Sequence, residues 1–368
     1  MYTEEHLYSI ALRQCANIGD LNFQKLVAVL GDAKSVWGSS KKEISKIPGV
    51  GQKIVSEIGS VDHLRFAEKE LLFCEKNQIK IRLKHKGDLP FLLAQCDDAP
   101  AILYQKGQFD ETLKNISLVG TRNITEYGRS FIESFFLEAK SKFISVSGLA
   151  LGVDKEVHEN SLKNHIPTIG VLAHGFHTFY PAKNKKLSEK ILEENGALLS
   201  EFNSSRKPDR ENFIQRNRVV AGLSEATIVV ETAFGGGSIS TANFANGYNR
   251  DVYALPGRIT DKCSQGCNHL IYQNKATAIS TISDLLELLN FSAKEAMEEL
   301  FPRSEVQVQL TDDQELIYKT IFQNPHICLD DLAEVISVSS HKILPIILEL
   351  ELLGKVKSFS GRKFLAIL

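Results

Sequence analysis

The middle of the chain alternates short apolar runs with longer stretches that have the mixed apolar and polar pattern of helices. Six runs of mostly apolar residues lie between residues 116 and 255, each short enough to be one buried strand. Because helix-like stretches separate most of these runs, the pattern predicts an α/β fold: a parallel sheet with helices on both faces. The runs are 116–120, 143–147, 168–173, 197–200, 226–230 and 252–255.

The two ends of the chain have different patterns. Residues 1–80 have a helical pattern with no strand-like run, which predicts a helical domain of the helix-hairpin-helix (SAM-like) type. Residues 310–368 have the pattern of three helices and a short hairpin with its turn at Gly361, which is the order of a winged helix. The polar, charged residues 295–309 predict a linker. The α/β domain is therefore expected to occupy residues 81–294.

The segment IPGVGQKIVSEI, residues 47–58, has the pattern of a helix-hairpin-helix turn. Gly49 and Gly51 allow a tight turn and leave backbone N–H groups free at the start of the next helix, where one DNA phosphate can bind. Gly49, Gly51 and Lys53 are therefore a candidate secondary DNA-binding hairpin. The alternative is a helical bundle that uses its glycines only for the turn. An earlier segment aligns Gly19 with Gly49 but carries Leu21 in place of the second glycine, so that copy is degenerate.

Composition limits the classes of protein that the chain can represent. Its 368 residues are enough for two or three domains, and no apolar run reaches the roughly 18–20 residues that a membrane span needs. The first residues carry two acids and no basic region, so we expect no signal peptide and no membrane partner. Six scattered cysteines fit free thiols in a reducing cytoplasm. A net charge of −2 means that any nucleic-acid site must be a local basic patch.

The turn after the first run, Gly120-Thr121-Arg122, has the chemistry of an anion site. At the carboxyl end of a strand, its N–H groups are expected to point into the crevice where open α/β sheets bind ligands. Thr121 adds a hydroxyl group, and Arg122 adds a planar guanidinium suited to phosphate. The dinucleotide-binding G-x-G-x-x-G motif is missing. A mononucleotide or a nucleic-acid backbone would both satisfy this turn. After the second run, the small residues Ser147 and Gly148 would let a ligand approach the backbone.

Basic residues surround an aromatic side chain between residues 206 and 218. Five basic residues against two acids give this stretch a local charge of +3, with Phe213 among them. An aromatic ring with flanking cations suits single-stranded nucleic acid, because the ring stacks on a base while the cations contact phosphates. The alternative is that Phe213 belongs to the core and that Arg216 and Arg218 pair with carbonyl groups at the ends of the strands. A lysine cluster after the third run includes Lys183 and Lys185.

The glycine-rich segment after the fifth run, FGGGSISTA, is typical of an anion-binding helix N-terminus. It contains Gly236, Gly237 and Ser238. The phosphate-binding G-x-x-x-x-G-K-[ST] motif of nucleoside triphosphatases is missing, so triphosphate hydrolysis is not supported. Two sets of residues could bind a metal: Cys263, Cys267 and His269, which lack a fourth ligand, and Asp154 with His158. For the latter pair, an internal bond from a helix-capping aspartate to the histidine is the simpler interpretation. We expect no metal and no cofactor.

Taken together, these motifs resemble the DNA-processing protein A (DprA, also called Smf) family. The resemblance spans residues 89 to 275 and is carried by LPFLLAQCDDAPAILYQKG, VGTRNITEYG, SGLALGVDKEVH, YPAKNKKL, LLSEF, FIQRNRVVAGLS, GGGSISTA and ALPG. It implies an extended Rossmann fold that dimerises and holds single-stranded DNA in a basic pocket. It also implies a function without catalysis, the delivery of incoming single-stranded DNA to a RecA-type recombinase during natural transformation.

The resemblance also suggests which residues contact DNA. Arg122 matches the arginine of the family's Gly-Ser/Thr-Arg motif, and Lys207, Arg210 and Phe213 lie in the segment before Arg-Asn-Arg where the family binds DNA. The segment AFGGGSIS departs from the expected serine-glycine-serine, which weakens the case for hydroxyl contacts there. The candidate DNA-binding residues are Gly120, Thr121, Arg122, Ser147, Gly148, Lys183, Lys185, Lys207, Arg210, Phe213, Arg216, Asn217, Arg218, Gly236, Gly237 and Ser238.

An enzyme is the competing interpretation. A related Rossmann group, the cytokinin-activating phosphoribohydrolases, uses P-G-G-x-G-T-x-x-E to cleave the glycosidic bond of a nucleotide. The corresponding segment here, FGGGSISTANFA, keeps the glycines but has no glutamate at the matching place. The reaction would therefore lack its acid. A pure protein-interaction scaffold is a third interpretation, but it leaves the basic segment 206–218 unexplained.

Overall fold

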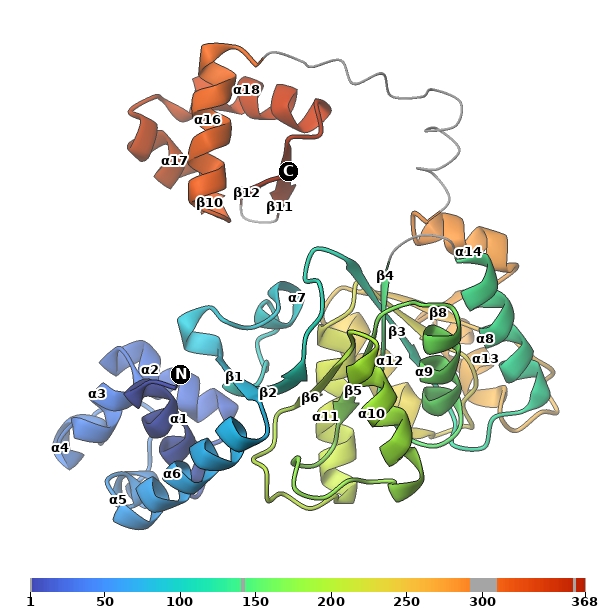
Figure 1. The fold of residues 1–368 in the computed structure, drawn as a ribbon, viewed down its shortest axis with the longest axis horizontal. Helices are drawn as coiled ribbons and strands as arrows, with labels where there is room; N and C mark the ends of the chain where they lie inside the picture. Colours follow the sequence, from blue (N-terminus) through green and yellow to red (C-terminus); the bar gives the residue numbers. More distant parts are fainter. Residues whose placement is uncertain (1, 140–142, 292–309, 360–361, 368) are drawn as a thin grey trace. The chain divides into compact units, whose positions relative to one another are not determined.

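The computed structural model of the protein describes residues 2–139, 143–291, 310–359 and 362–367, and it divides the chain into two compact units, Met1–Glu295 and Ala296–Leu368 (Figure 1). The predicted linker at 295–309 and the predicted turn at Gly361 lie outside the described residues. None of the helices within the described ranges is both long enough and apolar enough to cross a membrane.

Helices form the first part of the first unit. These helices lie beside strands β1 and β2 (Figure 1). Their apolar side chains pack around Leu12, Phe23 and Leu26 and also against the two strands. Because β1 begins at Ile79, and because the helices share a unit and a core with the sheet, the domain boundary at residue 80 stays a prediction. The helices are α1 (Glu4–Gln14), α2 (Asp20–Leu30), α3 (Ala33–Gly38), α4 (Lys41–Ile44), α5 (Gln52–Glu57) and α6 (Val61–Lys76).

A nine-stranded sheet forms the rest of the first unit, in the order β1-β2-β6-β5-β4-β3-β7-β8-β9. Strands β3 to β9 pair in parallel, which confirms the mixed α/β fold with a mostly parallel sheet. Strands β1, at one edge, and β2, next to it, pair antiparallel and were not among the predicted runs. The strands are β1 (Ile79–Leu83), β2 (Ile102–Gly107), β3 (Lys114–Val119), β4 (Phe143–Ser147), β5 (Thr168–Leu172), β6 (Ala197–Ser200), β7 (Ala226–Val229), β8 (Asp251–Ala254) and β9 (Thr277–Ala278).

Helices cover both faces of this sheet, as the sequence pattern predicts. Alternate strand residues point to opposite faces, so Val119 and Ile144 pack with α11, α12 and α13, while Ile116 and Leu118 pack with α8, α9 and α14. These and the connecting helices are η1 (Lys84–Lys86), α7 (Phe91–Ala94), α8 (Glu126–Glu138), α9 (Val153–Lys163), η2 (Ala182–Asn184), α10 (Lys185–Glu193), α11 (Arg210–Gly222), α12 (Gly237–Gly247), α13 (Gln265–Tyr272) and α14 (Ile282–Leu288).

The second unit contains helices and a three-stranded antiparallel sheet in the order β10-β12-β11. Its core includes Ile321, Leu332 and Ile343. The three helices and the last two strands come in the expected order, the short strand β10 between the first two helices was not predicted, and the winged-helix assignment itself stays a prediction. The elements are α16 (Asp312–Gln323), β10 (Ile327–Cys328), α17 (Leu329–Ile336), α18 (Ser340–Leu352), β11 (Val356–Phe359) and β12 (Lys363–Ala366).

Candidate nucleic-acid interface

A cavity of about 290 Å³ opens beside the carboxyl ends of the parallel strands β3, β4 and β7. The segments that follow these strands line it together with one side of α11. This is the crevice in which open α/β sheets bind ligands. It brings together ten of the candidate residues: Gly120, Thr121, Arg122, Gly148, Phe213, Arg216, Asn217, Gly236, Gly237 and Ser238.

Two guanidinium groups lie over the Phe213 ring in this cavity. The guanidinium carbon of Arg122 is 5.1 Å from the centre of the Phe213 ring, and that of Arg216 is 5.9 Å from it. Both distances are within the range of a cation–π interaction. Phe213 is half-buried and lines the cavity, so the alternative that it belongs to the core is wrong. Arg122 is exposed, so its charge is available to a ligand.

Arg216 is only 4% exposed and forms part of the cavity wall. Its guanidinium donates hydrogen bonds to the carbonyl oxygens of Gly148 and Val171, as the alternative interpretation of this arginine predicted. A Cβ atom on residue 148 would overlap the guanidinium, which explains the glycine there. Burial lowers the pKa of Arg216 and raises that of Asp154, while the attraction between the two groups opposes both shifts.

The turn at residues 120–122 differs in one respect from its prediction. The N–H of Thr121 does not point freely into the crevice, because it donates to the carbonyl oxygen of Glu231 at 2.7 Å. The hydroxyl of Thr121 accepts from the N–H of Asn123 at 3.1 Å. Thr125 caps α8, and the buried carboxylate of Glu231 accepts from both its N–H and its hydroxyl. The turn is therefore held rigidly by Glu231, a residue that the sequence analysis did not single out.

The start of α12 supplies the opposite side of the cavity. Gly236 is the N-cap residue and makes no side-chain cap, so the first N–H groups of this helix are available to an anion. The Ser238 hydroxyl is buried and has no hydrogen-bond partner among the described residues. Asn217 ties α11 to α12, because its amide donates to the Gly237 carbonyl and to the Ser240 hydroxyl at 3.2 and 2.8 Å. A bound anionic group would satisfy the donors that remain.

The other candidate residues do not line the cavity. Lys183, Lys185, Lys207 and Arg210 are exposed, and none of them forms an ion pair within the described part of the chain. Ser147 is fully buried, and its hydroxyl donates to the Leu118 carbonyl at 2.7 Å, so its prediction as a DNA contact is not supported. A buried hydroxyl that already has a backbone partner stabilises the strand ends instead.

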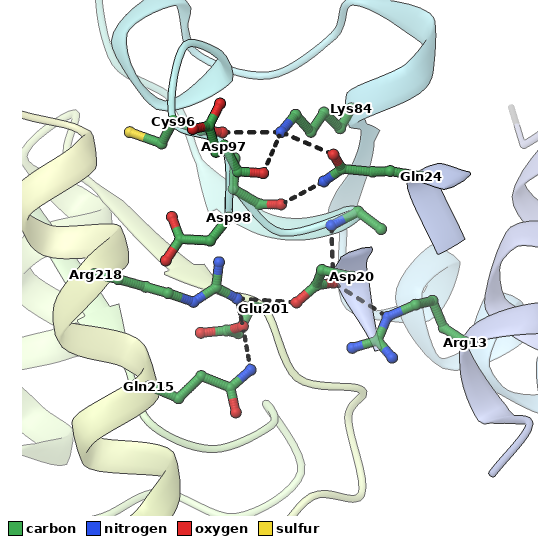
Figure 2. Close-up of polar contacts among 12 residues, drawn as sticks. Arg13, Asp20, Gln24, Lys84, Cys96, Asp97, Asp98, Glu201, Gln215 and Arg218 are labelled. Atoms are coloured by element: carbon green, nitrogen blue, oxygen red, sulfur yellow. Dashed lines mark hydrogen bonds and ion pairs between the residues drawn. The ribbon is translucent and has the colours of Figure 1, made fainter. Parts of the chain in front are cut away.

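Arg218 lies on α11 but does not line the cavity, and it pairs with Asp20 at the start of α2 (Figure 2). Its guanidinium forms ion pairs with Asp20 at 3.0 Å and with Glu201, and its side chain is only 7% exposed. The Asp20 carboxylate also accepts from the Ala101 N–H at 3.0 Å. Arg218 is therefore neutralised at an internal contact, and the structure does not support its prediction as a DNA-binding residue. Its alternative, a bond to strand-end carbonyls, does not describe it either.

The two glycine hairpins have different surroundings. In the second, Gly49 has a φ of +80°, Gly51 is the N-cap residue of α5, and both are exposed, as is Lys53. In the first, Gly19 precedes Asp20, whose carboxylate contacts the sheet. The degenerate copy is therefore used for an internal contact, and the second hairpin remains a candidate.

The two possible metal sets do not form a site. Within the ranges that the structure describes, no three His, Cys, Asp or Glu side chains gather in a way that could hold a metal ion. The predicted bond between Asp154 and His158 is wrong: Asp154 accepts from the Ala150 N–H at 3.3 Å, and His158 Nδ1 contacts the Thr168 hydroxyl at 2.7 Å. Burial lowers the pKa of His158 to about 3, so its ring is neutral.

Fold and cavity together define an α/β protein with a mostly parallel sheet and a crevice at its strand ends that is lined by two arginines and an aromatic ring. Residues 80–290 match the family model described as DNA recombination-mediator protein A, and the chain belongs to this family. It is thus a protein of the DprA/Smf type, whose general role is DNA processing.

Individual relatives agree with this assignment. Protein Smf of Synechocystis is 32% identical over 299 residues, which are 78% of this chain and 74% of the relative. DprA of Bacillus subtilis is 40% identical over 205 residues, 54% of this chain and 68% of the relative. The X-ray structure of Streptococcus pneumoniae DprA has a TM-score of 0.65 at 27% identity and covers 78% of this chain and 98% of its own. A Helicobacter pylori DprA structure, described for its single-stranded DNA binding mode, has a TM-score of 0.52 at 29% identity and covers 58% of this chain and 96% of its own.

Proposed function

We propose that this protein binds single-stranded DNA without sequence preference in the cavity at the strand ends and delivers it to a RecA-type recombinase during DNA uptake. The observation that carries the proposal is the Phe213 ring with the Arg122 and Arg216 guanidinium groups close to it, in a cavity that the uncapped start of α12 also lines. A base can stack on the ring only when it is not held in a duplex, and stacking tolerates any base. Phosphates can bind Arg122 and the free N–H groups of α12.

Affinity for single-stranded DNA should exceed affinity for duplex of the same length, and it should fall steeply with salt. Phosphate neutralisation releases counterions, so the logarithm of the binding constant falls with the logarithm of salt concentration by about 0.7 per phosphate contact on a single strand. Fluorescence anisotropy with labelled oligonucleotides of several sequences measures all three properties. Equal affinity for duplex and single strand, or a response that is flat in salt, would contradict the proposal.

No nucleotide hydrolysis is expected. The carboxylate nearest to the glycine-rich segment in sequence, Glu231, is buried and already accepts two hydrogen bonds from Thr125, so it is not placed to act as an acid. Incubation with nucleoside monophosphates, followed by chromatography for free base, should give no product above the background of protein-free samples. Base release that disappears in a Gly236→Ala variant would instead support the phosphoribohydrolase alternative.

We also propose that the protein is a cytoplasmic homodimer that pairs through the α/β domain. A surface beside α13 supports this, because Phe234, Ile259 and Tyr272 are 68%, 84% and 83% exposed and the Phe234 ring contacts His269. Exposed apolar groups of this size are typical of interaction sites. Light scattering after size exclusion should give the mass of a dimer, and Tyr272→Asp should give a monomer that is still folded. A dimeric Tyr272→Asp variant would place the interface elsewhere.

A further inference from the structure

A second cavity, of about 260 Å³, lies where the helical segment meets the sheet. We call it the seam cavity. Helices α1 and α6 line one side, and strand β2, residues 201–206 and α11 line the other. It shares α11 with the first cavity, since Phe213, Arg216 and Asn217 line the first and Gln215 lines the second. The two cavities are therefore separated by little more than the width of one helix.

The charges around the seam cavity nearly balance, and one exposed cation lies at its rim. Arg13 and Arg206 line it, and so does the buried carboxylate of Glu201. Glu201 pairs with Arg218, and Arg13 pairs with Asp20 at 3.3 Å (Figure 2). The buried carboxylate of Glu70 accepts hydrogen bonds from Ser204 and has no cationic partner within the described residues. The remaining positive charge belongs to the exposed Arg206. One phosphate could thus bind at the rim of the cavity, and the interior is close to neutral.

The interior of the seam cavity has the chemistry that recognises a nucleobase. The half-buried rings of Phe66 and Phe202 line it, together with the side-chain amides of Gln14, Asn203 and Gln215. Aromatic rings provide stacking surfaces, and amides both donate and accept hydrogen bonds. The Gln215 amide already donates to Glu201 at 2.7 Å, so a base with its phosphate at the rim would use the two rings and the amides of Gln14 and Asn203.

The wall between the two cavities is held in place by contacts from both sides. On α6, the buried carboxylate of Glu70 accepts from the N–H and from the hydroxyl of Ser204, both at 2.6 Å. On α11, the Asn212 amide donates to the Lys207 carbonyl at 3.0 Å, and its oxygen accepts from Arg206 at 3.0 Å. The segment that carries Arg206 and Lys207 into α11 is therefore fixed before any ligand binds, which lowers the cost of ordering it.

We propose that the DNA strand in the first cavity continues past Lys207 and Arg210 and places a second base in the seam cavity. This inference rests on the proposed function. It gives the exposed Lys207 and Arg210 a role, since both precede Phe213 in the segment that joins the two cavities. The helical segment thereby becomes part of the DNA site through α1 and α6, independently of its glycine hairpins.

Photocrosslinking of the full chain to oligothymidylates tests the path of the strand directly. A single 5-iododeoxyuridine is moved along the oligonucleotide, and trypsin then separates the peptide 191–206, which contains Phe202, from the peptide 211–216, which contains Phe213. We expect one register to label peptide 211–216 and another, a few nucleotides away, to label peptide 191–206. Label confined to 211–216 in every register would overturn this inference while keeping the proposed function. An absence of both binding and label would overturn both.

A cavity-filling variant provides the second test. Gln14→Trp places a bulky ring at the exposed entrance to the seam cavity from α1, and Gln108→Trp makes the same change on an exposed residue just beyond the far end of β2. Loss of one stacked base costs about 1–3 kcal/mol. Gln14→Trp should therefore lower the affinity for long oligonucleotides by roughly fivefold or more. Oligonucleotides too short to extend beyond the first cavity should bind the Gln14→Trp variant with normal affinity. Gln108→Trp should change the affinity for neither short nor long oligonucleotides. Equal effects of Gln14→Trp on short and long strands, or none on either, would overturn the inference.

Discussion

Arg122→Ala is expected to weaken binding of single-stranded DNA by about tenfold or more without changing the melting temperature. A hydrogen bond to a charged group contributes about 1.5–3 kcal/mol, and each 1.4 kcal/mol is a factor of about ten in affinity. Arg122 is exposed at the cavity and is not part of the core, so its removal should leave stability unchanged. Anisotropy titrations and thermal denaturation of the same samples measure both quantities.

Lys163→Ala is the matched control for this prediction. Lys163 is 71% exposed and is the last residue of α9, whose first turn lies at the cavity, so removing its charge changes the net charge equally without touching the site. Arg122→Lys should recover only part of the affinity, because an ammonium group cannot make a two-pronged phosphate contact. Normal affinity in Arg122→Ala, or an equal loss in Lys163→Ala, would mean that DNA binds elsewhere.

Unlike Arg122→Ala, the Arg216→Ala substitution is expected to lower the stability of the folded protein strongly. The substitution removes hydrogen bonds to the carbonyl oxygens of Gly148 and Val171 and leaves the buried Asp154 without its nearby positive charge. Leaving a buried charge without its partner costs about 3–5 kcal/mol. Chemical denaturation should therefore give a lower free energy of unfolding by about 3 kcal/mol. A variant as stable as the parent would mean that Arg216 serves the ligand and not the fold.

The pH dependence of the Arg216→Ala variant should identify Asp154 as the cause of its lower stability. Burial raises the pKa of Asp154, and Arg216 holds the rise in check, so the pKa rises further without the arginine. A carboxyl whose pKa is raised in the folded state binds its proton more tightly there, so stability falls as the pH rises between the unfolded and folded pKa values. The deficit of Arg216→Ala should shrink as the pH is lowered toward the unfolded pKa of an aspartate. Adding Asp154→Asn to Arg216→Ala should also reduce the loss of stability. A loss that changes neither with pH nor with Asp154→Asn would rule out Asp154 as its cause.

Local patterns in the sequence were sufficient for the central strands and for most of the cavity. Short apolar runs predict buried strands, and in a parallel sheet the carboxyl ends of these strands lie at one edge, so Gly120, Gly148 and Gly236 were expected near one another. Strands β1 and β2 were missed because their pairing with each other and with β6 is set by tertiary packing against the helical segment.

The roles of individual polar side chains were harder to predict. Arg216 and Arg218 are two positions apart on one helix and look alike in the sequence, yet one caps strand ends and the other pairs with Asp20, almost two hundred residues earlier. Glu70 and Glu231 hold the segments that border the cavities, and no local motif marks either of them. Such contacts depend on distant parts of the chain, and periodicity carries no information about them.

The contacts that α2 and α6 make with the sheet region determine which shortened fragments of this protein can fold. A fragment that starts at residue 81 would lose the first two residues of β1, the Asp20 partner of Arg218 and the Glu70 anchor of Ser204. It would expose the apolar face of β2 and would leave a buried arginine with one of its two carboxylates. Expression of the α/β region alone should therefore give aggregated or protease-sensitive material. We therefore expect the shortest soluble and folded fragment to keep the N-terminal helices and to end after α14.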